Sequence, residues 1–327
     1  MDRQAIRPRD FMETEKGLFF AAIAGDIAFL RYYPHPQGDR MRRGVAYRKV
    51  ASTMESFQYL RENAPEHLHL RGGRLLQRCP PETIRQVYSP AQRLMELEAE
   101  AAGDPLAMKA LGLSRLLEDV PEERKGVTGS LLVDMHRDSS DIDFVVYGVR
   151  QFHRAREALM ESGLAGNLTE EQWQRYYEKR FPGERALSHE DFLWHEKRKG
   201  NIGVYKGTIY NLLLVDDAVK LRPSTPVGPV KLMCTVTDAS MAFHVPSIYL
   251  VDHDLVDEVL SYTHTYAGQA MEGEVIEVSG VLEKKDRGWR VVVGTTREAV
   301  GEYIRVVRPE LDPPSGQRES PAQSKGM

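Results

Sequence analysis

The chain has 327 residues, of which 41% are hydrophobic and 28% are charged, and its formal net charge at pH 7 is -4. These values are typical of a globular protein large enough for two or three domains, and they exclude a minimal module. No apolar run approaches the roughly 20 residues needed to span a bilayer. The charged N-terminus is unlike a signal peptide, so the sequence predicts a cytoplasmic protein without a membrane partner. Cys79 and Cys234 form neither a zinc-ligand spacing nor a disulfide framework, and we expect two buried thiols.

Residues 1–88 are predicted to form a β-rich domain with one short helix. Two apolar strands within residues 17–34 are separated by Gly25 and Asp26, a pair that favours a turn. A helix is predicted after Ser52, which is a suitable N-cap, and it should stop before Pro65.

Residues 31–50 carry six basic side chains against one acidic side chain, with tyrosines between them. One interpretation is a solvated hairpin whose arginines pair with acidic neighbours. The other is an RNA-binding track in which tyrosines stack on bases and arginines follow phosphates. In that second case the nucleic-acid-binding residues would be Arg31, Tyr32, Arg40, Arg42, Arg43, Tyr47 and Lys49.

Residues 89–222 alternate between helical and strand patterns. Two helices are predicted within residues 89–120, with a break at 103–105, and a strand should then end at Gly129. A second strand should begin at Asp141 after a turn and one short helix. Further helices are predicted over 151–164, 169–181 and 188–200, followed by strands within 203–215.

Two features of this central region point to phosphate chemistry. A Gly129-Ser130 turn can present backbone N–H groups to an anion, and a glycine allows the anion to approach closely. Asp141 and Asp143 share one face of their strand, while Ile142 and the following phenylalanine face the core. Adjacent carboxylates repel each other unless cations bridge them, and magnesium with substrate phosphates is one such arrangement. The alternative is a strand-entry turn whose carboxylates face water.

From residue 223 the pattern changes to short strands separated by Gly, Pro and Asp. Residues 223–308 are therefore predicted to form a small antiparallel β-barrel or sandwich, and an oligonucleotide-binding barrel is one form of it. A hairpin turn is expected at residues 286–288. Residues 309–327 contain almost nothing apolar and should form a disordered tail.

The central motif resembles the signature of the DNA polymerase beta-type nucleotidyltransferase superfamily: Gly129-Ser130, ten residues, then Asp141-Ile-Asp143-Phe. Segments near residues 17–34, 126–148 and 280–295 resemble, more loosely, a family of predicted nucleotidyltransferases of archaea and some bacteria. The resemblance implies an α+β protein in which a polymerase beta-like α/β domain is flanked by β-rich N-terminal and C-terminal domains.

The resemblance also implies a two-metal mechanism. Asp141 and Asp143 would hold two magnesium ions, or manganese, and these would act on a nucleoside triphosphate and an acceptor hydroxyl. Gly129 and Ser130 would hold the β- and γ-phosphates, and Lys125 or Lys199 would neutralise developing charge.

One departure from the superfamily pattern concerns the third carboxylate, which a later strand normally supplies. The corresponding strand here has Asn211, which would coordinate metal through its carbonyl oxygen; Asp216 or Asp217 could substitute. The expected function is magnesium-dependent transfer of a nucleoside monophosphate, with RNA as the favoured acceptor. The alternatives are a catalytically weakened nucleotide- or RNA-binding protein and an enzyme that modifies a protein or a small molecule.

Overall fold

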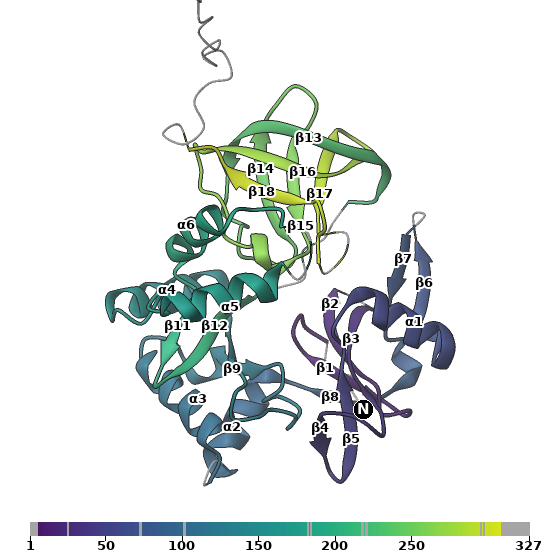
Figure 1. Cartoon of the computed structure of the whole chain (residues 1–327), viewed down its shortest axis with the longest axis vertical. Coiled ribbons are helices and arrows are strands. Elements are labelled where there is room, and N and C mark those ends of the chain that lie inside the picture. The colour runs from purple at the N-terminus through teal and green to yellow at the C-terminus, as the bar shows by residue number, and fades with distance from the viewer. Residues whose placement is uncertain are drawn as a thin grey trace, which may run out of the picture.

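The structure is a computed structural model and describes residues 6–24, 26–71, 74–100, 103–181, 183, 185–216, 219, 222–294, 296 and 298–308. The fold is α+β, with separate sheets in the N-terminal, central and C-terminal parts (Figure 1). Gly25, Asp217 and the expected tail lie outside the described residues. None of the described helices combines the length and the apolar character that crossing a membrane requires.

The N-terminal part is a six-stranded antiparallel sheet with strand order β4-β5-β3-β2-β1-β8. The predicted helix α1 is present, and Ser52 caps it by accepting a hydrogen bond from the Glu55 amide. Leu60 of this helix joins the core on one face of the sheet, beside the β6–β7 hairpin. The elements are β1 (Phe11–Thr14), β2 (Phe19–Ala24), β3 (Ile27–Pro34), β4 (Arg40–Arg42), β5 (Val45–Lys49), α1 (Thr53–Asn63), β6 (Leu68–Arg71), β7 (Arg74–Gln77) and β8 (Ile84–Tyr88).

The central part has a four-stranded mixed sheet with strand order β11-β12-β10-β9, in which only the β10–β12 pair is parallel. Buried residues of helices α2, α3 and α4 form one core with one face of this sheet. The strands are β9 (Lys125–Thr128), β10 (Ile142–Tyr147), β11 (Ile202–Tyr205) and β12 (Thr208–Val215). The helices are α2 (Pro90–Glu100), α3 (Pro105–Leu116), α4 (Val149–Glu161), α5 (Glu170–Arg180) and α6 (His189–Lys199).

The C-terminal part is a closed barrel, because five strands pair in the order β13-β14-β15-β17-β16 and β16 pairs again with β13. Five is the strand number of an oligonucleotide-binding barrel. The expected turn at 286–288 joins β16 to β17, and both cysteines of the chain are buried thiols. The elements are β13 (Ser224–Asp238), β14 (Ser247–Asp252), β15 (Glu258–Ser261), the 3-10 helix η4 (His264–Tyr266), β16 (Val275–Lys285), β17 (Trp289–Val293) and β18 (Tyr303–Val306).

Helices α5 and α6 connect the central sheet to the barrel. Aromatic residues of both helices, including Trp173 and Phe192, share one hydrophobic cluster with barrel residues such as Tyr249 and Val291. Figure 1 shows the two helices between the central sheet and the barrel, with the N-terminal sheet beside the central part. The free energy of this packing fixes α5 next to the start of β10, where the candidate site lies.

Candidate active site

Asp141 and Asp143 lie at the start of β10, on the face opposite the central core. Ile142 and Phe144 are fully buried, whereas both aspartates are partly exposed. The strand therefore has the expected alternation. The Asp141 carboxylate accepts an ion-paired hydrogen bond from the Lys179 ammonium of α5 at 2.6 Å.

Gly129 lies directly against the Asp143 carboxylate. Its φ is +68°, in the left-handed region that favours glycine, and Thr128 before it is the antiparallel partner of Asp143. A Cβ at position 129 would lie 2.5 Å from the Asp143 Oδ2 atom. A larger residue would therefore have to displace the carboxylate, and only glycine fits both the backbone and the contact.

The short helix predicted between Ser130 and Asp141 is not formed. Residues 129–134 form hydrogen-bonded turns, and the Met135 amide donates to the Ser130 carbonyl at 2.9 Å. The reason is that consecutive side chains of this segment are buried on different sides: Leu131 in the central core, Leu132 against the N-terminal sheet. Ser130 itself is buried in the turn.

Asn211 is the residue next to Asp143 across the parallel β10–β12 pair, but its orientation differs from the prediction. Its Nδ2 donates to Asp143 Oδ1 at 3.1 Å, and its Oδ1 accepts from the Tyr176 hydroxyl at 2.9 Å. Arg180 donates to the same hydroxyl. Because a guanidinium can only donate, the hydroxyl proton must point to Asn211, and the Asn211 amide N–H must then face Asp143. The expected carbonyl ligand is therefore occupied, and Asn211 acts as a hydrogen-bond donor.

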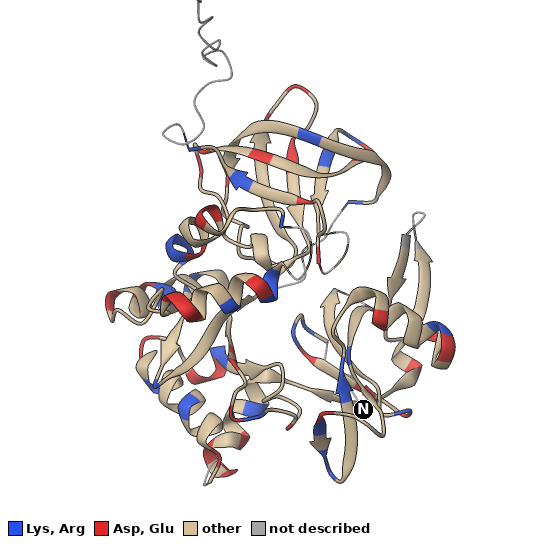
Figure 2. Ribbon diagram, viewed as in Figure 1, with Lys and Arg blue, Asp and Glu red and all other residues tan. Residues whose placement is uncertain are grey.

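Several positive side chains surround Asp143. It interacts electrostatically with Arg9 and Lys49 of the N-terminal part and with Arg180 of α5. Burial lowers the pKa of Lys49 to about 8, with Arg31 acting in the same direction and Asp143 opposing it. Burial likewise lowers the pKa of Arg9 to about 10. Figure 2 shows charges of both signs over all three parts of the molecule.

Lys125 is a predicted nucleotide-binding residue, but the structure places it elsewhere. It pairs with Val146, three residues along β10 from Asp143, and its side chain is fully buried. Its ammonium donates to the Ser114 carbonyl at 2.9 Å and to Glu122 at 2.7 Å. Lys125 therefore anchors α3 to the sheet and is too deeply enclosed to bind a phosphate.

The structure does not place the residues of the predicted RNA-binding track on one exposed surface. Tyr32 and Tyr47 are only 1% and 5% exposed, because Leu132 and Val133 of the central part pack over them. Their rings are therefore unavailable for base stacking. Arg42 is also buried: it ion-pairs with Glu13 and donates to the Val133 and Tyr88 oxygens.

The remaining members of that predicted track point in different directions. Arg43 is exposed in the β4–β5 turn, and Arg40 pairs with Asp39 at 2.8 Å. Arg31 and Lys49 are partly buried near Asp143. The tyrosines and Arg42 thus hold the N-terminal sheet against the central part, and two of the cations belong to the candidate active site.

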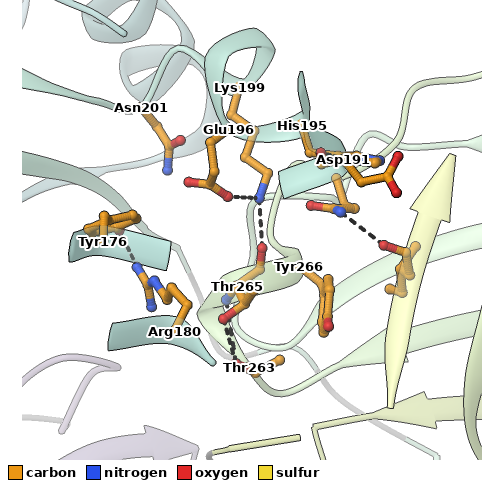
Figure 3. A network of polar contacts seen from close by, with 12 residues as sticks. Tyr176, Arg180, Asp191, His195, Glu196, Lys199, Asn201, Thr263, Thr265 and Tyr266 are labelled. Atoms are coloured by element: carbon orange, nitrogen blue, oxygen red, sulfur yellow. Dashed lines mark hydrogen bonds and ion pairs between the residues drawn. The ribbon is translucent and has the colours of Figure 1, made fainter. Parts of the chain in front are cut away.

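The barrel contributes to the surroundings of the site through η4. Lys199 is only 3% exposed, and its ammonium donates to Glu196 at 2.5 Å and to the Thr265 carbonyl at 2.6 Å (Figure 3). His264 lies near Arg180 and Arg9, and loss of solvation, together with these charges, holds its pKa well below its usual range. Lys199, the other lysine expected to neutralise developing charge, instead connects α6 to the barrel.

Of the two alternative acids at the end of β12, Asp216 does not complete the site. Asp216 follows Val215, which pairs with Tyr147 at the far end of β10, and its carboxylate contacts the His244 ring at 3.2 Å. Asp217 lies outside the described residues. Within the part of the chain that the structure describes, no three His, Cys, Asp or Glu side chains form a group that could hold a metal ion.

The donor atoms nevertheless suit one kind of magnesium site. Asp141 and Asp143 offer carboxylate oxygens, which magnesium prefers, but nearby cations and the Asn211 amide already engage them. The residues therefore fit an ion whose other ligands are substrate phosphates and water. They do not fit a site that holds metal on its own.

Three contributors to the site were not found from the sequence: Arg9, Tyr176 and Arg180. Arg9 is brought to β9 by a hydrogen bond from the Thr128 hydroxyl to its carbonyl at 2.8 Å. Tyr176 and Arg180 share one face of α5, at the spacing of one helical turn. No motif marks any of them, because each acquires its role from contacts between distant segments.

Comparison with known proteins gives one relative of nearly the same length. The chain is 34% identical, over 340 aligned positions, to "Uncharacterized protein MJ1086" of Methanocaldococcus jannaschii. The alignment covers 93% of the chain and 99% of the archaeal protein. No family model and no solved structure matches the chain.

Proposed function

The chain belongs to the same family as the Methanocaldococcus jannaschii protein, and we propose that it is a magnesium-dependent nucleotidyltransferase. It would move a nucleoside monophosphate from a nucleoside triphosphate to an acceptor hydroxyl. The observation that carries the proposal is the contact of Gly129 with Asp143, beside Asp141 and close enough to Arg9, Lys49 and Arg180 to interact electrostatically with them. This arrangement suits a compact polyphosphate with a divalent ion.

In the proposed reaction the acceptor oxygen forms a bond to the α-phosphorus. The bond from that phosphorus to the oxygen bridging to the β-phosphate breaks, pyrophosphate leaves, and the acceptor proton passes to solvent. Magnesium held by Asp141 and Asp143 would supply charge neutralisation and a lowered pKa of the acceptor hydroxyl. The chain itself orients Asp143 through Asn211 and keeps Asp141 in place through Lys179.

The N-terminal sheet and the barrel both bear on which acceptor is used. The burial of Tyr32 and Tyr47 removes the stacking residues on which the preference for RNA rested. The barrel region, residues 223–308, has 12 acidic and 8 basic side chains, which does not favour a phosphate backbone. We therefore propose nucleotidyl transfer to an acceptor hydroxyl and leave RNA, protein and small molecules as three classes to be compared by experiment.

The direct test is transfer from each α-labelled nucleoside triphosphate, with magnesium or manganese, into RNA, protein and small-molecule pools. Wild type should label one pool, and Asp143→Asn should not. Asp138→Asn, which changes an exposed carboxylate of the preceding loop, is the matched control and should transfer like wild type. Transfer that survives Asp143→Asn, or no transfer into any pool, contradicts the proposal.

A second candidate function is a nucleotide-binding protein without turnover. It is favoured by the absence of a third carboxylate at Asn211 and by the Lys179 ion pair on Asp141. Such a protein would bind a triphosphate in the same place and release it unchanged, so the transfer experiment combined with a binding measurement separates the two.

A further inference from the structure

One face of the N-terminal sheet is turned toward the Asp143 carboxylate. Lys49 of β5 pairs with Tyr32 of β3, so their side chains share a face, and Tyr32 packs with Leu132 and Val133 of the central part. Lys49 therefore projects from the sheet on the side of the central part, next to the segment that follows Gly129.

Arg31 reaches the same face because of a bulge. Phe19 and Phe20 of β2 pair with Tyr32 and Leu30, which leaves Arg31 as the extra residue in β3. A bulge re-aims side chains, and the Arg31 charge accordingly lies close enough to Lys49 to act on its pKa. Regular alternation would have put the Arg31 and Tyr32 side chains on opposite faces.

Arg9 lies two residues before β1 of the same sheet, where its amide donates to the Ala22 carbonyl of β2 at 3.0 Å. Its carbonyl accepts the Thr128 hydroxyl, and Thr128 is the strand partner of Asp143, so the Arg9 backbone is held beside the carboxylate. Its Nε atom is buried and has no hydrogen-bond partner within the described chain. A buried unpaired guanidinium N–H is costly, which suggests that a ligand normally accepts from it.

These three side chains form a cluster of unbalanced positive charge. Among the described residues, none of Arg9, Arg31 and Lys49 has a side-chain hydrogen bond or an ion pair with an acidic group within 4.0 Å. The two nearby carboxylates are already engaged, Asp141 by Lys179 and Asp143 by Asn211. The lowered pKa values of Lys49 and Arg9 are consistent with cations that are desolvated and repel one another.

We propose that Arg9, Arg31 and Lys49 bind the polyphosphate of a nucleoside triphosphate, so that the N-terminal domain completes the active site of the central domain. The identity of the ligand rests on the proposed function. A polyphosphate matches the cluster because its adjacent phosphates concentrate several negative charges at one place, as these converging cations do. An RNA backbone would instead need cations spread along an exposed surface.

The test measures binding of inorganic tripolyphosphate by calorimetry, in the presence of a chelator so that no metal takes part. Wild type should bind, and Arg31→Ala and Lys49→Ala should each weaken binding by about ten- to a hundredfold, the range for one lost charge-assisted contact. Lys49→Arg keeps the charge and should retain most of the affinity. Arg43→Ala removes an exposed cation of the same domain and should bind like wild type.

Asp143→Asn separates this inference from the proposed function. It removes the negative charge that faces the cluster, so it should bind tripolyphosphate at least as tightly as wild type while losing any transfer activity. If the wild type transfers nothing but the binding pattern holds, the polyphosphate site stands and the reaction is wrong. Unchanged tripolyphosphate binding by Arg31→Ala and Lys49→Ala, with weakened binding of single-stranded RNA, would assign the cations to RNA and overturn the inference. A correctly folded wild type that does not bind tripolyphosphate would overturn it as well.

Discussion

The Asn211 side-chain amide donates a hydrogen bond to Asp143 Oδ1 at 3.1 Å, where the superfamily resemblance implies a carboxylate. Arg180 sets this direction, because its guanidinium can only donate to the Tyr176 hydroxyl. The hydroxyl proton must then go to the Asn211 carbonyl, which leaves the Asn211 amide N–H to face Asp143. The four residues come from β10, β12 and α5. Packing of α5 against the barrel therefore positions a carboxylate of the central sheet.

Tyr176→Phe should break this series of hydrogen bonds at its middle. The buried Asn211 carbonyl would lose its donor and the partly buried Arg180 would lose an acceptor, so the free energy of unfolding should fall by about 1–3 kcal/mol. The Asn211 amide would also become free to turn. Urea unfolding measures the stability, and a change below about 0.5 kcal/mol would show that the hydrogen-bond chain does not contribute as described.

Gly129→Ala should damage the site more than the fold. The left-handed backbone should cost about 1–2 kcal/mol with any side chain, and the new methyl group would in addition push Asp143 aside. Gly163→Ala is the matched control, because Gly163 has φ +70° and a Cβ there would meet no atom within 4 Å. Gly163→Ala should have the backbone cost alone, and only Gly129→Ala should lose nucleotide binding. Equal nucleotide binding by the two would contradict the role of the contact.

Polyphosphate binding should weaken as the pH rises through about 8. The folded-state pKa of Lys49, about 8, lies below its ordinary value of 10.5, so the charged form is disfavoured in the fold. The resulting cost to stability is full below pH 8 and disappears as the pH rises toward 10.5. The charges that face Lys49 are those of Arg31, Asp143, Lys179 and Arg40.

Calorimetric titrations with tripolyphosphate between pH 7 and about 9 would measure this dependence, below the range in which Arg9 titrates. Lys49→Arg should remove most of the pH dependence, since arginine stays protonated throughout. A wild type whose dependence matches that of Lys49→Arg would exclude Lys49 as the titrating ligand.

Lys179→Gln should release Asp141 without harming the fold. The lysine side chain is 62% exposed, so its ion pair should contribute less than about 1 kcal/mol to stability. Removing it should let the protein bind manganese more tightly in the absence of nucleotide, because a cation no longer competes for the carboxylate. Arg175→Gln changes an exposed ion pair on the same helix and should leave manganese binding as in wild type. Equal manganese binding by the two variants would contradict competition at Asp141.

The sequence predicted the parts of the site that depend on local pattern. Strand alternation is enough to put Asp141 and Asp143 opposite the buried Ile142, and the strands on either side of the 286–288 turn followed from hairpin chemistry. The α+β class also followed from the mixture of helical and strand patterns. These features need only the neighbouring residues.

The sequence did not predict the features of the site that depend on contacts between distant segments. In the sequence, Tyr32 and Tyr47 resemble exposed stacking residues. In the fold, Leu132, about a hundred positions away, covers them. The segment that contains Leu132 does not form the expected helix, because its side chains are buried on two different sides. A bulge turns Arg31 toward the site, and Arg180 fixes the orientation of Asn211; neither effect has a signature in one segment.

Asp141 and Asp143 are proposed to hold a divalent ion that is delivered with a nucleotide, and manganese binding followed by electron paramagnetic resonance would show whether they do. The nucleotide would be a triphosphate whose α–β bridging oxygen is replaced by methylene, so that no transfer occurs. Wild type should bind manganese tightly only when this nucleotide is present, and Asp143→Asn should not. Tight manganese binding by Asp143→Asn with the nucleotide, or none above the level of free nucleotide by wild type, would contradict the account.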